Sequence, residues 1–284
     1  MSLSLRCPVC HTPLGTLEPK NGGGAFCPAG HRFDRARQGY LNLLLSNKMN
    51  SKKPGDDKQM VQARTRFLDS GHYAPVSSAL TRTVKKLVSD ADRPVILDAG
   101  CGEGYYTDEI HKALPNAIMG GVDISKPAII QCCRRNREIH WLVASVNDLP
   151  VTGNQVDVIV SVFSRCDWQE FSRVLKPSGH VVVVALGEKH LLALREVIYE
   201  SVRPYPVDKI INNLPDGFLN TENQDIVSNM RLGSSSQILD LLAMTPHYWH
   251  VKSAQKVRLS QLSSLVCDID MRCYVIKYSP NTKC

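Results

Sequence analysis

Apolar positions first recur with a helical period, close to residue 60. The apolar residues at helical spacing form two series: Met60, Ala63 and Phe67, and then Val76, Leu80, Val84 and Leu87. This spacing predicts two helices, each with one apolar face. The run Pro94–Asp98 that follows is short and apolar, as is typical of a parallel strand buried on both faces. The pattern therefore predicts two helices ahead of a first central strand.

Strand and helix patterns then alternate as far as residue 186. We expect strands over 118–122, 141–144, 156–162 and 181–185, and helices over 106–113, 126–135 and 168–175. Strict alternation of this kind predicts an α/β fold with a doubly wound, Rossmann-like parallel sheet. Residues 188–250 are expected to be mostly helical, and 271–278 to form a final strand.

The first 38 residues differ from the rest because they are rich in Cys, Pro and Gly and lack a periodic apolar pattern. They contain Cys7-Pro-Val-Cys10 and Cys27-Pro-Ala-Gly-His31, a C-x2-C-x16-C-x3-H arrangement. Two tight turns that each carry two soft ligands suit tetrahedral Zn²⁺, and four protein ligands indicate a structural ion. His11 adjoins Cys10 too closely to chelate the same ion without strain. We therefore predict one zinc bound by Cys7, Cys10, Cys27 and His31.

The expected domains are a zinc-binding module (1–38), a basic linker (39–58) and a large α/β domain (59–284). The charge supports this division. Residues 1–66 hold 11 Lys and Arg against 4 Asp and Glu, whereas the remainder is balanced. A basic head on a neutral body favours a polyanionic partner, although a solvated loop would have the same charge. The basic positions singled out are Arg32, Arg35, Arg37, Lys52 and Lys53.

Length and composition exclude several classes of protein. A chain of 284 residues, 43% of them hydrophobic, can bury an ordinary core and is not disordered throughout. It has no run of about 18 apolar residues and no apolar stretch of a secretory signal at its start. We expect a cytoplasmic protein without membrane contact, in which the 10 cysteines are free thiols or metal ligands.

The segment Leu97-Asp-Ala-Gly-Cys-Gly-Glu-Gly104 leads from the first strand into a helix. Its glycines allow a ligand to approach the backbone closely. Tyr105 stands where a dinucleotide fingerprint needs its third glycine, which disfavours a nicotinamide cofactor. Asp98 can order the loop and face an amino-acid ammonium, and Asp123 can accept both hydroxyls of a ribose.

These residues resemble the S-adenosylmethionine-dependent class I methyltransferases. LDAGCGEG, GVDIS, ASVNDLPV and RVLKPSGHVVVV occur in the order of that family. Ser145 replaces an acid that many of these enzymes place near the adenine. Ser178 stands in a turn that usually reads Pro-Gly-Gly, where we expect it to be structurally neutral.

A narrower resemblance covers nearly the whole chain. CPVCHTPL, CPAGHRFDRARQGYLNLL, KPGDDKQMVQARTRFLDSGHYAPV, GEKHLLALR and LLAMTPHYW are similar to the bacterial 23S ribosomal RNA guanine-N1-methyltransferases of the RlmA type. The resemblance implies methyl transfer from S-adenosylmethionine to N1 of a guanine, and a zinc module that helps to grip a hairpin of 23S ribosomal RNA. A homodimer with facing zinc modules is compatible with it.

The family's cofactor contacts fall on Tyr73, Gly102, Glu103 and His190. Together with the glycine-loop reasoning, the predicted cofactor residues are Tyr73, Asp98, Gly100, Cys101, Gly102, Glu103, Asp123, Ser145 and His190. For Tyr73 the alternative is a packing aromatic at a helix start. For His190 it is a solvated histidine at a helix start.

The chemistry of guanine N1 needs removal of a proton, and the sequence assigns no catalytic base. Asp167 and His190 are the nearest candidates by position. Cys166 supports an alternative, RNA pyrimidine-C5 methylation through a covalent thiol adduct. A small-molecule methyltransferase, an RNA-binding module without catalysis and another Rossmann-type protein also remain as alternatives.

Overall fold

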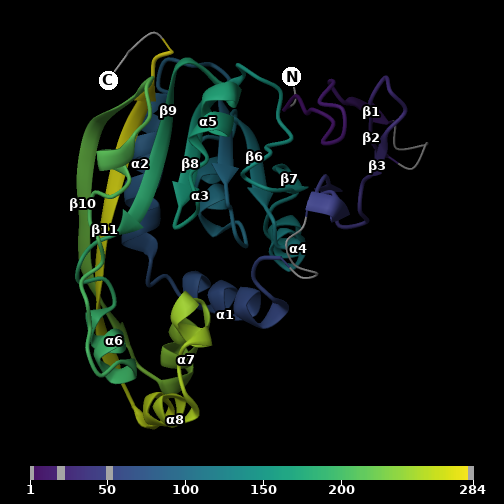
Figure 1. The fold of residues 1–284 in the computed structure, drawn as a ribbon. Coiled ribbons are helices and arrows are strands. Elements are labelled where there is room, and N and C mark those ends of the chain that lie inside the picture. The colour runs from purple at the N-terminus through teal and green to yellow at the C-terminus, as the bar shows by residue number, and fades with distance from the viewer. Residues whose placement is uncertain (1–2, 18–22, 49–53, 281–284) are drawn as a thin grey trace.

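The computed structural model describes residues 3–17, 23–48 and 54–280, and an eight-stranded sheet dominates it (Figure 1). The strand order is β10-β11-β9-β8-β5-β6-β7-β4. β11 is antiparallel to both of its neighbours, β10 and β9, and all other neighbouring strands pair in parallel. The strands are β4 (Leu41–Asn42), β5 (Val95–Ala99), β6 (Ile118–Asp123), β7 (His140–Val143), β8 (Val156–Val162), β9 (Leu175–Leu186), β10 (Phe218–Leu232) and β11 (Leu265–Tyr278). The predicted Rossmann-like α/β fold is confirmed, with a mixed rather than purely parallel sheet.

Helices cover both faces of this sheet. They are α1 (Lys58–Asp69), α2 (Ala74–Leu87), α3 (Tyr105–Ala113), α4 (Lys126–Arg135), α5 (Trp168–Val174), α6 (Leu192–Ile198), α7 (Ser235–Ala243) and α8 (Ser253–Gln261), with short 3-10 turns η2 (Ser46–Lys48), η3 (Ile211–Asn213) and η4 (Pro246–Trp249). Alternate residues of the central strands belong to two apolar clusters, one shared with α2, α3 and α4 and the other with α5. In the part of the chain that is described, no helix has the length and apolarity to cross a membrane.

The prediction for residues 188–250 was wrong, because β10 occupies Phe218–Leu232. Only Phe218, Ile226, Met230 and Leu232 of β10 are buried, and most of its remaining positions are polar. An edge strand with one polar face lacks the apolar run that marks a buried strand. β11 also begins six residues before the predicted final strand, because residues 265–270 pair with β10 alone and β9 joins only at Met271.

The zinc module is a three-stranded antiparallel sheet formed by β1 (Gly15–Leu17), β2 (Gly24–Phe26) and β3 (Arg32–Asp34). Its first residues are anchored in the large domain. The side chain of Leu3 is buried in the apolar cluster of α5, and Leu5 forms a bridge with Val151. Arg6 pairs with Asp148 at 2.8 Å and Glu170 at 3.0 Å. No pattern in the sequence predicted that residues 3–6 pack against the large domain.

The expected linker 39–58 also contributes to the large domain. Leu41 and Asn42 form β4, which pairs with β7 in a parallel register. Asp57 caps α1 by accepting hydrogen bonds from the amides of Gln59 and Met60. Lys52 and Lys53, singled out for their charge, lie outside the described residues.

Ser178 is not structurally neutral. Its φ is 68°, in the left-handed region where an L side chain is sterically disfavoured and glycine is not. Ser178 is exposed, so nothing in the surrounding packing requires its side chain. The usual glycine at this position fits the backbone better.

Candidate functional site: a zinc centre and a cofactor edge

The four predicted zinc ligands converge in the structure. Their ligand atoms all lie within 4.8 Å of one another. Nδ1 of His31 is 3.6 Å from Sγ of Cys7 and 3.2 Å from Sγ of Cys27, and the thiols of Cys10 and Cys27 are 3.6 Å apart. A tetrahedral Zn²⁺ with Zn–S bonds of about 2.3 Å separates two sulfur ligands by about 3.8 Å. The cluster therefore fits a closed, structural zinc site.

Local structure explains the convergence. Each Cys-containing turn closes on a backbone hydrogen bond, from His11 N to Cys7 O and from Gly30 N to Cys27 O. The Thr12 hydroxyl lies 3.1 Å from Sγ of Cys10 and lowers the pKa of that thiol to about 6, which favours the metal-binding thiolate. Nε2 of His11 lies 3.9 Å from Asp148, so His11 is outside the cluster as expected.

The glycine loop lies at the carboxyl end of β5 and is fastened to β6. The amide of Gly100 donates to Val122 O at 2.8 Å, and the amide of Gly102 donates to Oδ2 of Asp123 at 2.9 Å. Oδ1 of Asp123 accepts the amide of Ser125 at 2.7 Å. Asp123 therefore joins the loop to the start of α4, and burial raises its pKa to about 6. Each carboxylate oxygen retains a lone pair for a ligand hydroxyl.

Asp98, at the end of β5, has a buried carboxylate oxygen that is available to a ligand. It is 2% exposed, and its Oδ2 accepts the Thr107 hydroxyl at 2.6 Å. Its Oδ1 is buried and has no hydrogen-bond partner among the described residues. Burial, with the nearby charges of Asp123 and Glu103, raises the pKa of Asp98 to about 7. A cationic group on a bound ligand would satisfy this oxygen and its charge.

Two of the predicted loop residues have side chains that serve packing. The Cys101 thiol is buried against Gly121, and burial raises its pKa. The Glu103 carboxylate is buried and pairs with Arg135 at 2.7 Å. Gly102, by contrast, faces open space: an added methyl group would meet only Nη1 of Arg64, at 3.5 Å. The backbone at Gly102 is therefore the part of the loop that a ligand can approach.

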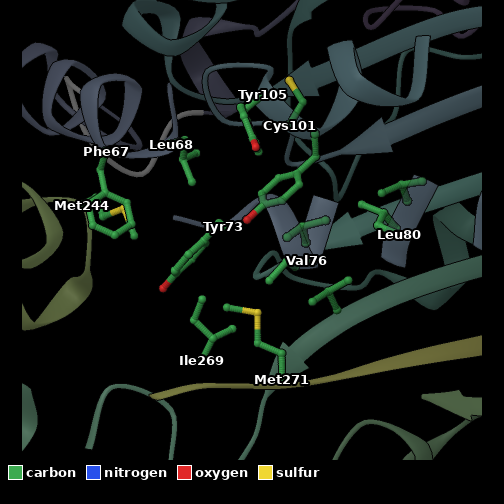
Figure 2. Close-up of a cluster of buried hydrophobic side chains, with 14 of the residues drawn as sticks. Phe67, Leu68, Tyr73, Val76, Leu80, Cys101, Tyr105, Met244, Ile269 and Met271 are labelled. Carbon is green, nitrogen blue, oxygen red and sulfur yellow. The ribbon is translucent and has the colours of Figure 1, made fainter. Parts of the chain in front are cut away.

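Tyr73 and His190 contact each other directly, although 117 residues separate them. Figure 2 shows Tyr73 at the centre of a buried cluster, with Phe67 to one side and Ile269 and Met271 nearby. Its hydroxyl lies 3.2 Å from Nε2 of His190. His190 is 3% exposed, so the interpretation as a solvated histidine was wrong.

The backbone around His190 assigns its tautomer. The amide of Asp270 donates to Nδ1 at 3.4 Å, and burial lowers the histidine pKa to about 4. A neutral imidazole that accepts at Nδ1 carries its proton on Nε2. His190 therefore donates to the oxygen of Tyr73, which leaves the Tyr73 hydroxyl proton for another acceptor. It also follows that His190 has no free lone pair with which to act as a base.

The other residues considered for the chemistry have structural partners. Asp167 accepts the Glu170 amide at the start of α5 and the side-chain amide of Asn147 at 2.7 Å. The Cys166 thiol contacts the Ser161 hydroxyl, and burial raises its pKa. A raised thiol pKa is the opposite of what a nucleophilic cysteine needs.

Ser145 follows β7 at the same carboxyl edge, because the amide of Ala144 donates to Asp123 O at 3.1 Å. Its hydroxyl accepts the amide of Asn147 at 3.2 Å. Phe163 and Ser164, which sequence reasoning did not single out as site residues, lie here too. Ser164 packs directly on Gly100, and Phe163 stacks on His190. No motif marked either residue, since their importance comes from loops that are distant in sequence.

The carboxyl edge of β5, β6 and β7 fits S-adenosylmethionine on two observations of the structure. Oδ1 of Asp98 is a buried acceptor that suits an ammonium group, and the open side of Gly102 admits a ligand against the backbone. Asp123 lies at the end of the neighbouring strand, where a ribose can reach it.

Known protein families match both the N-terminal module and the large domain. Residues 5–52 match the family profile described as "RlmA, N-terminal", a zinc ribbon, and residues 96–179 match the profile described as "Methyltransferase domain". The first profile spans β1 to η2 and thus includes β4, which lies in the large sheet.

Full-length relatives are found among curated proteins. A protein of Micromonospora griseorubida, assigned by name to the 23S rRNA (guanine-N(1)-)-methyltransferases, is 32% identical over 277 residues, covering 92% of each chain. The 23S rRNA (guanine(748)-N(1))-methyltransferase of Streptomyces fradiae is 31% identical over 248 residues, covering 87% of this chain and 86% of the relative. With these matches across both domains, the chain belongs to the 23S rRNA (guanine-N1)-methyltransferase family.

Proposed function

We propose that the protein transfers a methyl group from S-adenosylmethionine to N1 of a guanine in 23S ribosomal RNA. The observation that carries the proposal is the combination, in one chain, of the Cys3His cluster, the glycine loop and an Asp98 oxygen that has no partner among the described residues. Relatives that cover both domains are named for this activity. The RNA class and the acceptor atom rest on those relatives.

The cofactor would lie along the carboxyl edge of β5, β6 and β7. In this proposal Gly102 admits its backbone approach, and Gly100 lets Ser164 pack against the loop. Asp98 holds the ammonium, and Asp123 accepts the ribose hydroxyls. Ser145 lies toward the adenine, while Tyr73 and His190 lie toward the methionine end. Cys101 and Glu103 contribute through their backbone, because their side chains are engaged in packing and in the ion pair with Arg135.

Direct methyl transfer requires no covalent bond between the protein and the RNA. When bound, S-adenosylmethionine supplies an electrophilic methyl group on sulfur. Transfer of this methyl group to guanine N1 would leave the electrons of the carbon–sulfur bond on sulfur and release the N1 proton to solvent. The residues of this chain would orient the base and exclude water around the buried pair of Tyr73 and His190. Both ring nitrogens of His190 are engaged, so His190 is not a base in this proposal. Asp167 is given the role of capping α5.

The zinc module would grip the RNA, and a hairpin is the predicted form. Arg32, Arg35 and Arg37 are exposed, and they follow His31 directly, so zinc binding holds their segment in place. Exposed guanidinium groups bind RNA phosphates with an affinity that falls as the salt concentration rises. A homodimer and a cytoplasmic location remain predictions.

Reverse transcription tests the acceptor atom. Ribosomal RNA from a strain lacking the protein, treated with the enzyme and S-adenosylmethionine, should acquire one new stop next to a guanine. N1 methylation blocks the Watson–Crick face, whereas C5 methylation of a pyrimidine leaves it free. Cys166→Ser should retain the stop, because the structure gives this thiol a raised pKa and a packing role. Methylated RNA without a stop, together with an inactive Cys166→Ser variant, would instead support pyrimidine chemistry. Absence of transfer to any RNA would support a small-molecule substrate.

The basic surface of the zinc module has a separate test. Replacing Arg35 and Arg37 by glutamine should weaken RNA binding and lower the slope of log K against log salt by about 1 per lost phosphate contact. Affinity for S-adenosylhomocysteine should not change. Lys85 and Arg93 form the control pair, since both are exposed and lie on α2 and before β5. An unchanged salt slope in the Arg35 and Arg37 variant would show that RNA binds elsewhere.

A further inference from the structure

Phe163 has an unusual conformation for its position in the fold. It directly follows β8, yet its side chain is 46% exposed, whereas Ser161 and Val162 before it are buried. Its φ is 52°, and its amide donates to Val184 O at 3.1 Å. A bulky residue rarely adopts this left-handed backbone, and such strain concentrates at functional sites.

Phe163 adjoins a residue that packs on the glycine loop, and its ring contacts the buried histidine. The next residue, Ser164, packs on Gly100. On its inner side the ring stacks on His190, with centroids 6.4 Å apart and planes inclined by 24°. His190 is in turn fixed by Tyr73 and by the Asp270 amide. One face of an aromatic ring is therefore supported, and much of the remaining ring surface is open to solvent.

We propose that Phe163 is the stacking platform for the target guanine, an inference that rests on the proposed function. N1 lies on the Watson–Crick face, so the base must leave its helix or loop stack before the methyl group can reach it. A base outside its stack binds well to an aromatic face, which every base can use. Because Ser164 touches Gly100, a base on Phe163 lies beside the loop that would hold the cofactor.

Other exposed apolar side chains lack this combination. Trp249 is 62% exposed, but it lies in η4 with its ring against Tyr248 and contacts no residue of the glycine loop among those described. Leu219 is 55% exposed on the edge strand β10. Only Phe163 among the described exposed apolar residues adjoins a residue that packs on the glycine loop.

The test separates aromatic stacking from packing. Phe163→Leu keeps an apolar side chain without a π face, and Phe163→Tyr and Phe163→Trp keep the ring. At saturating S-adenosylmethionine, Phe163→Leu and Phe163→Ala should lower kcat/KM for the ribosomal RNA by about 10- to 100-fold, the range expected from the loss of one stacked base. The Tyr and Trp variants should remain within about threefold of the wild type, as should the Leu219→Ala control.

Binding of S-adenosylhomocysteine by calorimetry provides a readout that is independent of activity. It should be unchanged in all Phe163 variants, because the base and not the cofactor contacts the outer ring face. Wild-type transfer in Phe163→Leu would overturn the inference, and so would a parallel loss of S-adenosylhomocysteine affinity, which would make Phe163 a support of the cofactor loop. If the wild type itself methylates no guanine, the proposed function fails and this inference with it. An active wild type with an unaffected Phe163→Leu variant removes only the platform.

Discussion

Substitution of Asp98 by asparagine should lower the affinity for S-adenosylhomocysteine by about 10- to 100-fold and abolish the reverse-transcription stop. A charge-assisted hydrogen bond to a buried carboxylate is worth about 1.5–3 kcal/mol, which corresponds to this factor. The asparagine side chain has the same shape and can still accept the Thr107 hydroxyl, so the loop keeps its main support. Calorimetry and primer extension measure the two effects separately.

The same substitution should change how binding depends on pH. The wild-type pKa of Asp98 is about 7 because the carboxyl group is buried, and a cationic ligand favours its charged form. Affinity for S-adenosylhomocysteine should therefore fall about tenfold as the pH drops from 8 to 6, beyond any change that the ligand's own amine causes. In Asp98→Asn the affinity should change with pH only as far as the ligand's own amine titrates, and the tenfold change due to Asp98 should be absent. Identical pH profiles in the two proteins would show that Asp98 does not face the ammonium.

Stability provides the control for misfolding. The folded pKa of Asp98 lies above its ordinary value of 3.8, so its neutral form favours folding below pH 4 and this contribution is lost as the pH rises through 7. At pH 8 the asparagine variant should be more stable than the wild type, by at most about 4 kcal/mol. A variant that is more stable and yet unable to bind the cofactor has lost a functional group. A less stable variant would indicate damage to the fold instead.

Loss of the zinc ion should unfold the N-terminal module while leaving the cofactor edge intact. In small zinc domains the metal supplies about 10–16 kcal/mol of folding free energy, and the described part of this module has few buried apolar residues besides Ala25 and two ligands. Purified protein should contain one zinc per chain. Cys27→Ser should lose the ion and weaken RNA binding about 100-fold, since the basic surface is no longer held in place.

Binding of S-adenosylhomocysteine should remain within about twofold in Cys27→Ser, because the predicted cofactor residues lie between 73 and 190. Cys166→Ser is the matched control, since Cys166 is half-buried and outside the zinc cluster, and it should retain full zinc occupancy. Elemental analysis and calorimetry measure both quantities. Full zinc occupancy in Cys27→Ser would contradict the ligand set.

Local patterns were enough to predict the central sheet and the zinc ligands. The strand of residues 156–162 and the helix of residues 126–135 have the bounds that their apolar periods predicted. The two Cys turns and the glycine loop have spacings that only a few backbone geometries satisfy. In each case, neighbouring residues carry the signal, so no knowledge of distant contacts was needed.

The prediction failed where a segment depends on a partner far away in the chain. β10 is a strand because β11 supplies its hydrogen bonds, and its polar exposed face hides this from an analysis of its sequence. Leu3 is buried because the N-terminal segment crosses to the large domain and packs beside Gly120.

The amino-acid sequence by itself determined the fold class, the zinc ligands and the position of the glycine loop, because each depends on the periodicity or spacing of nearby residues. Tertiary structure alone decided how the side chains at that edge meet. It buried His190 against Tyr73 and left one oxygen of Asp98 without a partner in the part of the chain that the structure describes. It also turned Phe163 outward beside Gly100, through a backbone conformation that its residue type disfavours. These relations join loops that follow different strands, and only the packing of the sheet brings their ends to one edge.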